Sequence, residues 1–137
     1  MSKIEQRVIK FRAWDRTKNQ WFYPPDKMDS HLGDFSMTGD GRVYIDGQYQ
    51  DLTLCQFTGL YDQDKQKIYE GDICEAFKPN SYLDGIYEVA WHQEKGRWYY
   101  KNQPDYRKLY QVGCTGNLTC RIVGNIFQNG DLLNVKD

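Results

Sequence analysis

The sequence lacks the features that mark a protein for secretion or for a membrane. No stretch approaches the roughly 20 apolar residues of a membrane-spanning helix, and residues 1–7 lack the apolar core of a signal peptide. The chain has four cysteines, Cys55, Cys74, Cys114 and Cys120, which form no CxxC pair. We therefore expect a cytoplasmic protein with reduced thiols and no membrane segment.

Residues for several common kinds of site are missing or widely spaced. A structural zinc site pairs ligands about two to four residues apart, whereas the cysteines are further apart and His31 and His92 are isolated. A cysteine nucleophile needs a neighbouring base, and neither histidine lies in a recognisable nucleophile motif. Residues 113–117 are rich in glycine but lack the lysine of a phosphate-binding loop. We expect no metal, no cofactor and no catalytic residue.

Neither sign of charge dominates the chain. It has 18 lysine and arginine residues against 19 aspartate and glutamate residues, a net charge of −1. Non-specific binding of nucleic acid depends on clustered basic side chains that neutralise phosphates. The charge balance therefore weighs against a nucleic-acid-binding protein, although it leaves room for a local basic face.

Aromatic residues are the abundant feature. The 137 residues include 11 Tyr, 6 Phe and 4 Trp, which together make up 15% of the chain. Their rings bury large areas, and Tyr and Trp can keep a polar tip at a boundary. Such a composition suits thin β-layers better than a leucine-rich helical bundle. The chain is also long enough to bury a core without disulfides or metal.

The first part of the chain predicts short β-hairpins. Residues 7–14 alternate apolar and polar side chains, which is typical of a half-buried strand, and residues 20–23 return after a polar turn. Asp46 and Gly47 favour the positive φ that a type I′ hairpin requires at both turn positions. Residues 26–41 are expected to form a loop with one helical turn.

The rest of the chain predicts a succession of short strands. Runs of apolar, β-branched and aromatic residues recur between turn signals, at residues 52–57, 73–77, 86–91, 97–100 and 118–126. Asp84 and Gly85 are expected to form a turn, and residues 101–117 a long loop. We predict an all-β fold with little helix, in which an N-terminal β-hairpin region (1–53) precedes a small barrel-like, SH3-like module (54–137).

The most distinctive segment is residues 58–73. Its Glu70 and Asp72 are close enough in sequence to suggest the paired carboxylates of a hydrolase, but turn chemistry explains them more simply. Gly71 permits a tight bend, and the Asp72 side chain can accept hydrogen bonds from nearby backbone N–H groups. The polar residues 62–67 are expected to stay in water. We predict a structural motif made of Gly59, Tyr69, Gly71 and Asp72.

Five blocks of sequence are specific when taken together. They read Ile-Lys-Phe-Arg-Ala-Trp-Asp (9–15), Gln-Phe-Thr-Gly-Leu-Tyr-Asp (56–62), Lys-Ile-Tyr-Glu-Gly-Asp-Ile-Cys (67–74), Glu-Val-Ala-Trp (88–91) and Ile-Val-Gly-Asn-Ile-Phe-Gln-Asn (122–129). In this order they resemble the YopX family of phage and prophage proteins. Cys74 stands where an aliphatic residue is more usual, and Gly130 where a proline is common. The resemblance adds Gly124 and Asn125 to the structural motif. It implies a β-rich fold and a phage or prophage origin in a bacterial host, and it supplies no catalytic residue.

Residues 95–110 combine aromatic and basic side chains. Alternation sends Trp98 and Tyr100 to one face, expected to be core, and leaves Tyr99 outside. Tyr, Trp and Arg are favoured anchors of protein interfaces, and aromatics with cations also bind single-stranded nucleic acid. The candidate interaction surface consists of Tyr99, Tyr106, Arg107 and Tyr110. The favoured prediction is a non-enzymatic accessory protein that binds a protein partner or itself; a single-stranded nucleic-acid binder and a hydrolase are the alternatives.

Overall fold

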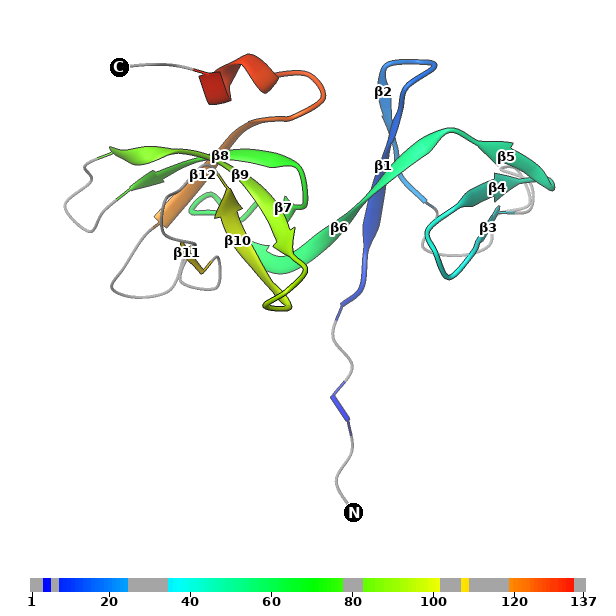
Figure 1. Ribbon diagram of the computed structural model, residues 1–137, viewed down its shortest axis with the longest axis horizontal. Coiled ribbons are helices and arrows are strands. Elements are labelled where there is room, and N and C mark those ends of the chain that lie inside the picture. Colours follow the sequence, from blue (N-terminus) through cyan, green and yellow to red (C-terminus); the bar gives the residue numbers. More distant parts are fainter. Residues whose placement is uncertain are drawn as a thin grey trace. The chain divides into compact units, whose positions relative to one another are not determined.

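The computed structural model describes residues 4–5, 8–24, 35–77, 83–101, 107–108 and 119–134 (Figure 1). Apart from a 3-10 helix at Gly130–Asn134 (η3), the regular elements of these residues are β-strands, which confirms the predicted all-β class. The chain divides into two compact units: Lys10–Gln56, and Phe57–Asp137 with Met1–Ile9. Within the described ranges, no helix has the length and apolar character needed to cross a bilayer.

One sheet of the unit Lys10–Gln56 is built around β1 (Phe11–Asp15). This strand pairs antiparallel with β2 (Gln20–Phe22) on one side and with the first half of β6 (Leu52–Tyr61) on the other. The Asp15 carboxylate closes the β1–β2 turn by accepting hydrogen bonds from the backbone N–H groups two and three residues later. The alternation in the sequence therefore predicted this hairpin because its turn and register are local.

A second sheet of the same unit is a three-stranded meander. Its strands are β3 (Phe35–Met37), β4 (Val43–Ile45) and β5 (Gln48–Gln50), in that order. Asp46 and Gly47 have φ values of 52° and 76° between β4 and β5. The predicted hairpin is confirmed, with positive φ at both turn positions.

The prediction of a loop over residues 26–41 is wrong for the second part of this range. Phe35–Met37 forms a strand that pairs with β4, and the ring of Phe35 stacks on that of Phe22 at 6.1 Å between centroids. Pairing and ring contact with residues distant in sequence outweigh the polar, glycine-rich local pattern. Residues 25–34, with the expected helical turn, lie outside the described part of the chain.

The unit Phe57–Asp137 contains a five-stranded antiparallel sheet that curls into a half-barrel (Figure 1). The order is β11-β10-β9-β8-β12, where the strands are β8 (Asp72–Phe77), β9 (Leu83–His92), β10 (Arg97–Lys101), β11 (Arg107–Lys108) and β12 (Thr119–Asn125). The second half of β6 pairs with β7 (Lys67–Tyr69). The curled sheet is the barrel-like part that the strand pattern predicted.

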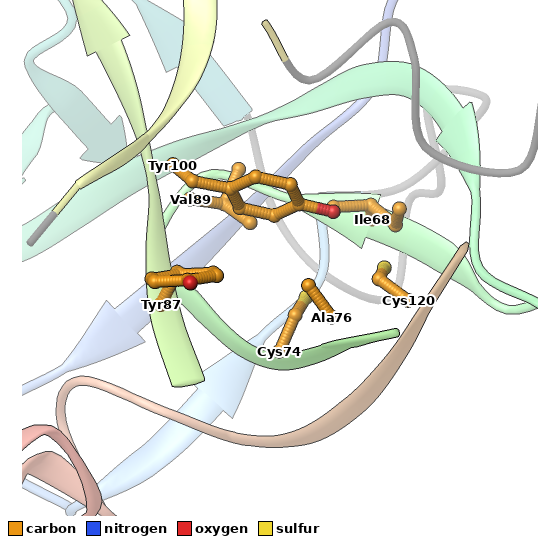
Figure 2. Packing of buried hydrophobic residues seen from close by; sticks show 7 residues of the cluster. All are labelled: Ile68, Cys74, Ala76, Tyr87, Val89, Tyr100 and Cys120. Carbon is orange, nitrogen blue, oxygen red and sulfur yellow. The ribbon is translucent and has the colours of Figure 1, made fainter. Parts of the chain in front are cut away.

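The core of this unit lies on the concave face of the curled sheet. Its buried side chains come from β7, β8, β9, β10 and β12 and are Ile68, Cys74, Ala76, Tyr87, Val89, Tyr100 and Cys120 (Figure 2). The rings of Tyr87 and Tyr100 lie 5.3 Å apart. Aromatic rings thus carry much of the burial, as the composition suggested.

The prediction of a turn at Asp84 and Gly85 is wrong. Both residues lie inside β9, where Gly85 pairs with Ala76 next to a register shift of the β8–β9 ladder. A Cβ at Gly85 would collide with the ring of Tyr87, two residues along the same strand. Gly85 is therefore there to make room for a core ring, so an Asp-Gly pair here does not mark a turn.

The hydroxyl group of Tyr100 yields the first testable prediction. Its oxygen is buried and has no hydrogen-bond partner among the described residues, and burial together with the thiols of Cys120 and Cys74 raises the pKa of Tyr100. Since an unsatisfied buried hydroxyl is destabilising, Tyr100→Phe should leave the free energy of unfolding unchanged or raise it by about 1 kcal/mol. Urea denaturation measures this change.

Tyr100→Ala provides the comparison for that measurement. Removing the whole ring should lower the free energy of unfolding by about 3–5 kcal/mol, because a buried aromatic side chain leaves a cavity. A loss of more than about 1 kcal/mol in Tyr100→Phe would instead show that the hydroxyl makes a stabilising hydrogen bond.

Candidate functional site

The β6–β7 hairpin begins the segment that stood out in the sequence. Gly59 has a φ of +86° and lies at a register shift of the β6–β7 ladder. The Thr58 hydroxyl donates to the backbone oxygen of Ile68 at 2.8 Å and accepts from the N–H of Leu60 at 3.1 Å. The side chain of Thr58 thus replaces ladder bonds at the point where the strand bends.

The prediction that residues 62–67 stay in water is wrong for Asp62. Its neighbours in the loop are exposed, but Asp62 itself is only 5% exposed. One carboxylate oxygen accepts from the backbone N–H groups of Asp64 and Gln66, at 2.9 and 2.8 Å. The buried carboxylate therefore organises the loop from inside, a role that a polar run in the sequence conceals.

The second oxygen of Asp62 reaches the edge of the five-stranded sheet. It accepts from the N–H of Ile122 in β12 at 3.1 Å. The N–H of Gln63 donates to the backbone oxygen of Cys120 in the same strand at 2.9 Å. The loop thus occupies hydrogen-bonding groups of an edge strand, which would otherwise be open to pairing with another chain.

The turn between β7 and β8 contains the second buried carboxylate. Asp72 is 2% exposed and accepts from the N–H of Tyr69 at 2.8 Å. Gly71 has a φ of +88°; its N–H donates to the oxygen of Val89, and its own oxygen accepts from the N–H of Ile126, both at 2.9 Å. This turn joins three parts of the half-barrel through backbone hydrogen bonds.

Gly124 and Asn125 form the matching feature at the end of β12. A Cβ at Gly124 would lie 2.5 Å from the side-chain oxygen of Asn129, which accepts from the N–H of Asn125 at 3.1 Å. The Asn125 side chain in turn accepts from the N–H groups of Phe127 and Gln128, both at 3.0 Å. The glycine allows close approach, and the asparagine closes the turn that leads into η3.

The candidate interaction surface is described in part. Tyr99 lies on β10, half-buried, on the face of the sheet opposite to the core residue Tyr100. Arg107 lies in β11, and its backbone pairs with that of Tyr100 in β10. The side chain of Arg107 lies outside the described part of the chain. Tyr106 and Tyr110 also lie outside it. Of the four predicted residues, the described part of the chain therefore includes the side chain of Tyr99 alone.

The β9–β10 hairpin adds residues that sequence reasoning did not select. On the outer face, the ring of Tyr99 lies 5.1 Å from that of His92, and His92 is the cross-strand partner of Arg97. On the inner face, Trp91 is 42% exposed and packs edge-on against Trp98 at 5.0 Å. Trp91 with Trp98, and His92 with Arg97, are spaced symmetrically about the turn at residues 93–96, and this spacing is the sequence signal that could have identified the hairpin pairs.

The thiols are placed as core residues. Cys55, Cys74 and Cys120 are buried and free, and Cys114 and His31 lie outside the described residues. A hydrogen bond with Cys120 and burial raise the pKa of Cys74, which keeps the thiol protonated. In the described residues, no group of three or more His, Cys, Asp and Glu side chains is arranged to hold a metal ion.

These features define a small all-β protein whose distinctive polar residues build turns and seal a sheet edge. The chain belongs to the YopX protein family, whose sequence profile matches residues 10–134, and the resemblance seen in the five blocks is thereby confirmed. The crystal structure of protein EF1440 from Enterococcus faecalis is similar: the TM-score is 0.58 and the identity 25%, over 93% of this chain and 99% of that chain. No curated protein matches the sequence.

Proposed function

We propose that this protein is a non-enzymatic protein-interaction module of phage or prophage origin that acts in the bacterial cytoplasm through its β9–β10 hairpin. The observation that carries the proposal is the aromatic exposure of this hairpin: Trp91 is 42% exposed and packs edge-on against Trp98. Tyr99 and His92 form a second ring pair on the other face. Large rigid rings held in place before binding are typical anchors of protein interfaces.

The two buried carboxylates of residues 58–73 support a non-enzymatic role. Acid/base work needs a carboxyl group that is free to exchange a proton with a substrate. Asp62 accepts three backbone hydrogen bonds, and Asp72 is buried and accepts from the N–H of Tyr69. Asp72, one of the two carboxylates that suggested a hydrolase, is therefore committed to the fold, and so is its neighbour in the motif, Asp62; this argues against the hydrolase alternative.

The Trp91→Ala, Tyr99→Ala double variant tests the proposal. Truncating two interface anchors should weaken binding by at least about 2 kcal/mol, or roughly 30-fold in Kd. The tagged protein is incubated with lysate of cells that carry the gene, and captured proteins are quantified by mass spectrometry. A specific partner captured by the wild type should be lost in the double variant.

Tyr49→Ala is the matched control for that capture. Tyr49 is 60% exposed and packs against Tyr44 at 5.8 Å, so it resembles the Trp91–Trp98 pair but lies in the other unit. Capture should survive this substitution. Equal capture by the wild type and the double variant would contradict the proposal.

A single-stranded nucleic-acid binder is the alternative, favoured by Lys95, Arg97 and Lys101, which are close in sequence to the aromatic residues of the hairpin. Fluorescence anisotropy with labelled dT20 and rU20 over a salt series separates the two functions. Affinity that falls steeply with salt would support nucleic-acid binding, because phosphate contacts release counterions. Absence of salt-dependent binding would remove this alternative.

A further inference from the structure

The outer face of the β9–β10 hairpin carries three cross-strand pairs in a row. Alternation places every second residue on this face, opposite the core, and the pairs are Arg97–His92, Tyr99–Ala90 and Lys101–Glu88. A large ring thus lies beside a small side chain, and a cation beside a carboxylate. In two of the pairs, β10 provides the bulky or basic residue (Tyr99, Lys101) and β9 the small or acidic one. In the third pair, at the hairpin end, Arg97 lies opposite His92.

The charges of the two strands are segregated by sign. In sequence, β9 (Leu83–His92) contains two acidic residues and no lysine or arginine, whereas β10 (Arg97–Lys101) contains two basic residues and no acidic residue. Among the described residues, neither Glu88 nor Lys101 takes part in an ion pair. Two neighbouring strands of opposite charge form a surface that is complementary to itself after a half-turn about an axis parallel to the strands.

Arg97, at the hairpin end of this face, has an unsatisfied polar atom. Its Nε is buried, and within the described part of the chain no hydrogen-bond acceptor reaches it. A buried donor without an acceptor costs free energy, and buried polar groups in native structures are almost always satisfied. An acceptor brought by another molecule, with a change of the Arg97 side-chain rotamer, would remove this cost.

We propose that a second copy of this chain packs on this face, so that β9 of each copy lies over β10 of the other. Lys101 then faces Glu88 of the second copy and Tyr99 covers its Ala90, which matches charge and volume at once. The proposal rests on the proposed function, because it names the partner of the same hairpin. The chain's net charge of −1 favours a protein partner over nucleic acid on this face.

Charge reversal gives a direct test. In the homodimer of Lys101→Glu, two acidic side chains face each other across the interface, and in that of Glu88→Lys two basic side chains do so. Each variant alone should therefore lose at least about tenfold in dimer affinity by sedimentation velocity, because facing like charges repel. An equimolar mixture of the two variants should recover dimers, and native mass spectrometry should show the mass of the mixed species.

The mixture separates contacts between chains from contacts within one chain. Lys101 and Glu88 are also cross-strand neighbours in the same chain, and that pair stays mismatched in both variants after mixing. Recovery of dimers can therefore come only from pairing between chains. Lys18→Glu, an exposed charge reversal in the β1–β2 turn, should leave the wild-type dimer intact.

Three results would overturn the inference. They are a wild-type protein that is monomeric at several hundred micromolar, single variants that dimerise like the wild type, and a mixture that stays monomeric. If the wild type is monomeric but still captures a partner that the Trp91→Ala, Tyr99→Ala variant loses, only this inference fails and the proposed function stands. A monomer that binds dT20 with strong salt dependence would overturn both.

Discussion

Asp62→Ala is expected to lower the free energy of unfolding by about 3 kcal/mol. The substitution removes the acceptor of three backbone N–H groups, at distances of 2.8–3.1 Å. Two of these donors are in an exposed loop and can turn to water. The third, the N–H of Ile122, lies in β12 and would remain unsatisfied, and this accounts for most of the expected loss. Urea denaturation by circular dichroism measures the change.

Asp62→Asn refines the expectation. The asparagine oxygen can still accept from the N–H groups of Asp64 and Gln66, but the amide NH₂ then faces the N–H of Ile122, so two donors oppose each other. We expect an intermediate loss of about 2 kcal/mol. Asp64→Asn, a surface change in the same loop, should stay within about 0.5 kcal/mol. If all three variants were equally stable, Asp62 would have no structural role.

Hydrogen exchange can locate the damage in the Asp62 variants. The bonds from Asp62 and Gln63 occupy the outer edge of β12. The amide of Ile122 should therefore exchange faster in Asp62→Ala than in the wild type, whereas amides between β1 and β2 should be unchanged. An edge strand that loses its cover also tends to pair with other chains, so the variant should aggregate at lower concentrations than the wild type.

Local sequence patterns predicted the parts of the fold that depend on near neighbours. Alternation over residues 7–14 marked β1, and Asp46 with Gly47 marked the β4–β5 hairpin, because strand faces and type I′ turns are decided within a few residues. Alternation also placed Tyr99 on the face opposite Tyr100. Each of these features has its physical cause within about ten residues of chain.

Features whose partners are distant in sequence could not be predicted in this way. Asp62 looked like a solvated residue because the N–H that it binds, on Ile122, lies 60 residues away. Gly85 looked like a turn residue because the ring that occupies its side-chain space, Tyr87, becomes fixed only by packing in the core. The unsatisfied Nε of Arg97 is likewise a property of packing, which a residue type alone does not reveal.

Gly71→Ala is expected to cost about 1–2 kcal/mol of unfolding free energy. A φ of +88° is strained for any residue with a Cβ, at about 1–2 kcal/mol. The backbone cannot relax to a negative φ without losing two hydrogen bonds, to Val89 and from Ile126. Losing both bonds would itself cost about 2 kcal/mol, so relaxation offers no cheaper state than the strained turn. The melting temperature and a urea titration measure the effect.

Gly59→Ala isolates the contribution of those two hydrogen bonds. Gly59 has nearly the same φ, +86°, and a Cβ there would meet nothing within 4 Å. Gly59 lies at a register shift of the β6–β7 ladder, so its backbone can relax more freely, and the loss should stay below about 1 kcal/mol. The difference between the two variants measures how firmly the bonds to Val89 and Ile126 hold the β7–β8 turn. Equal losses would mean that the turn is only a sharp bend, and that its bonds to Val89 and Ile126 contribute nothing to stability.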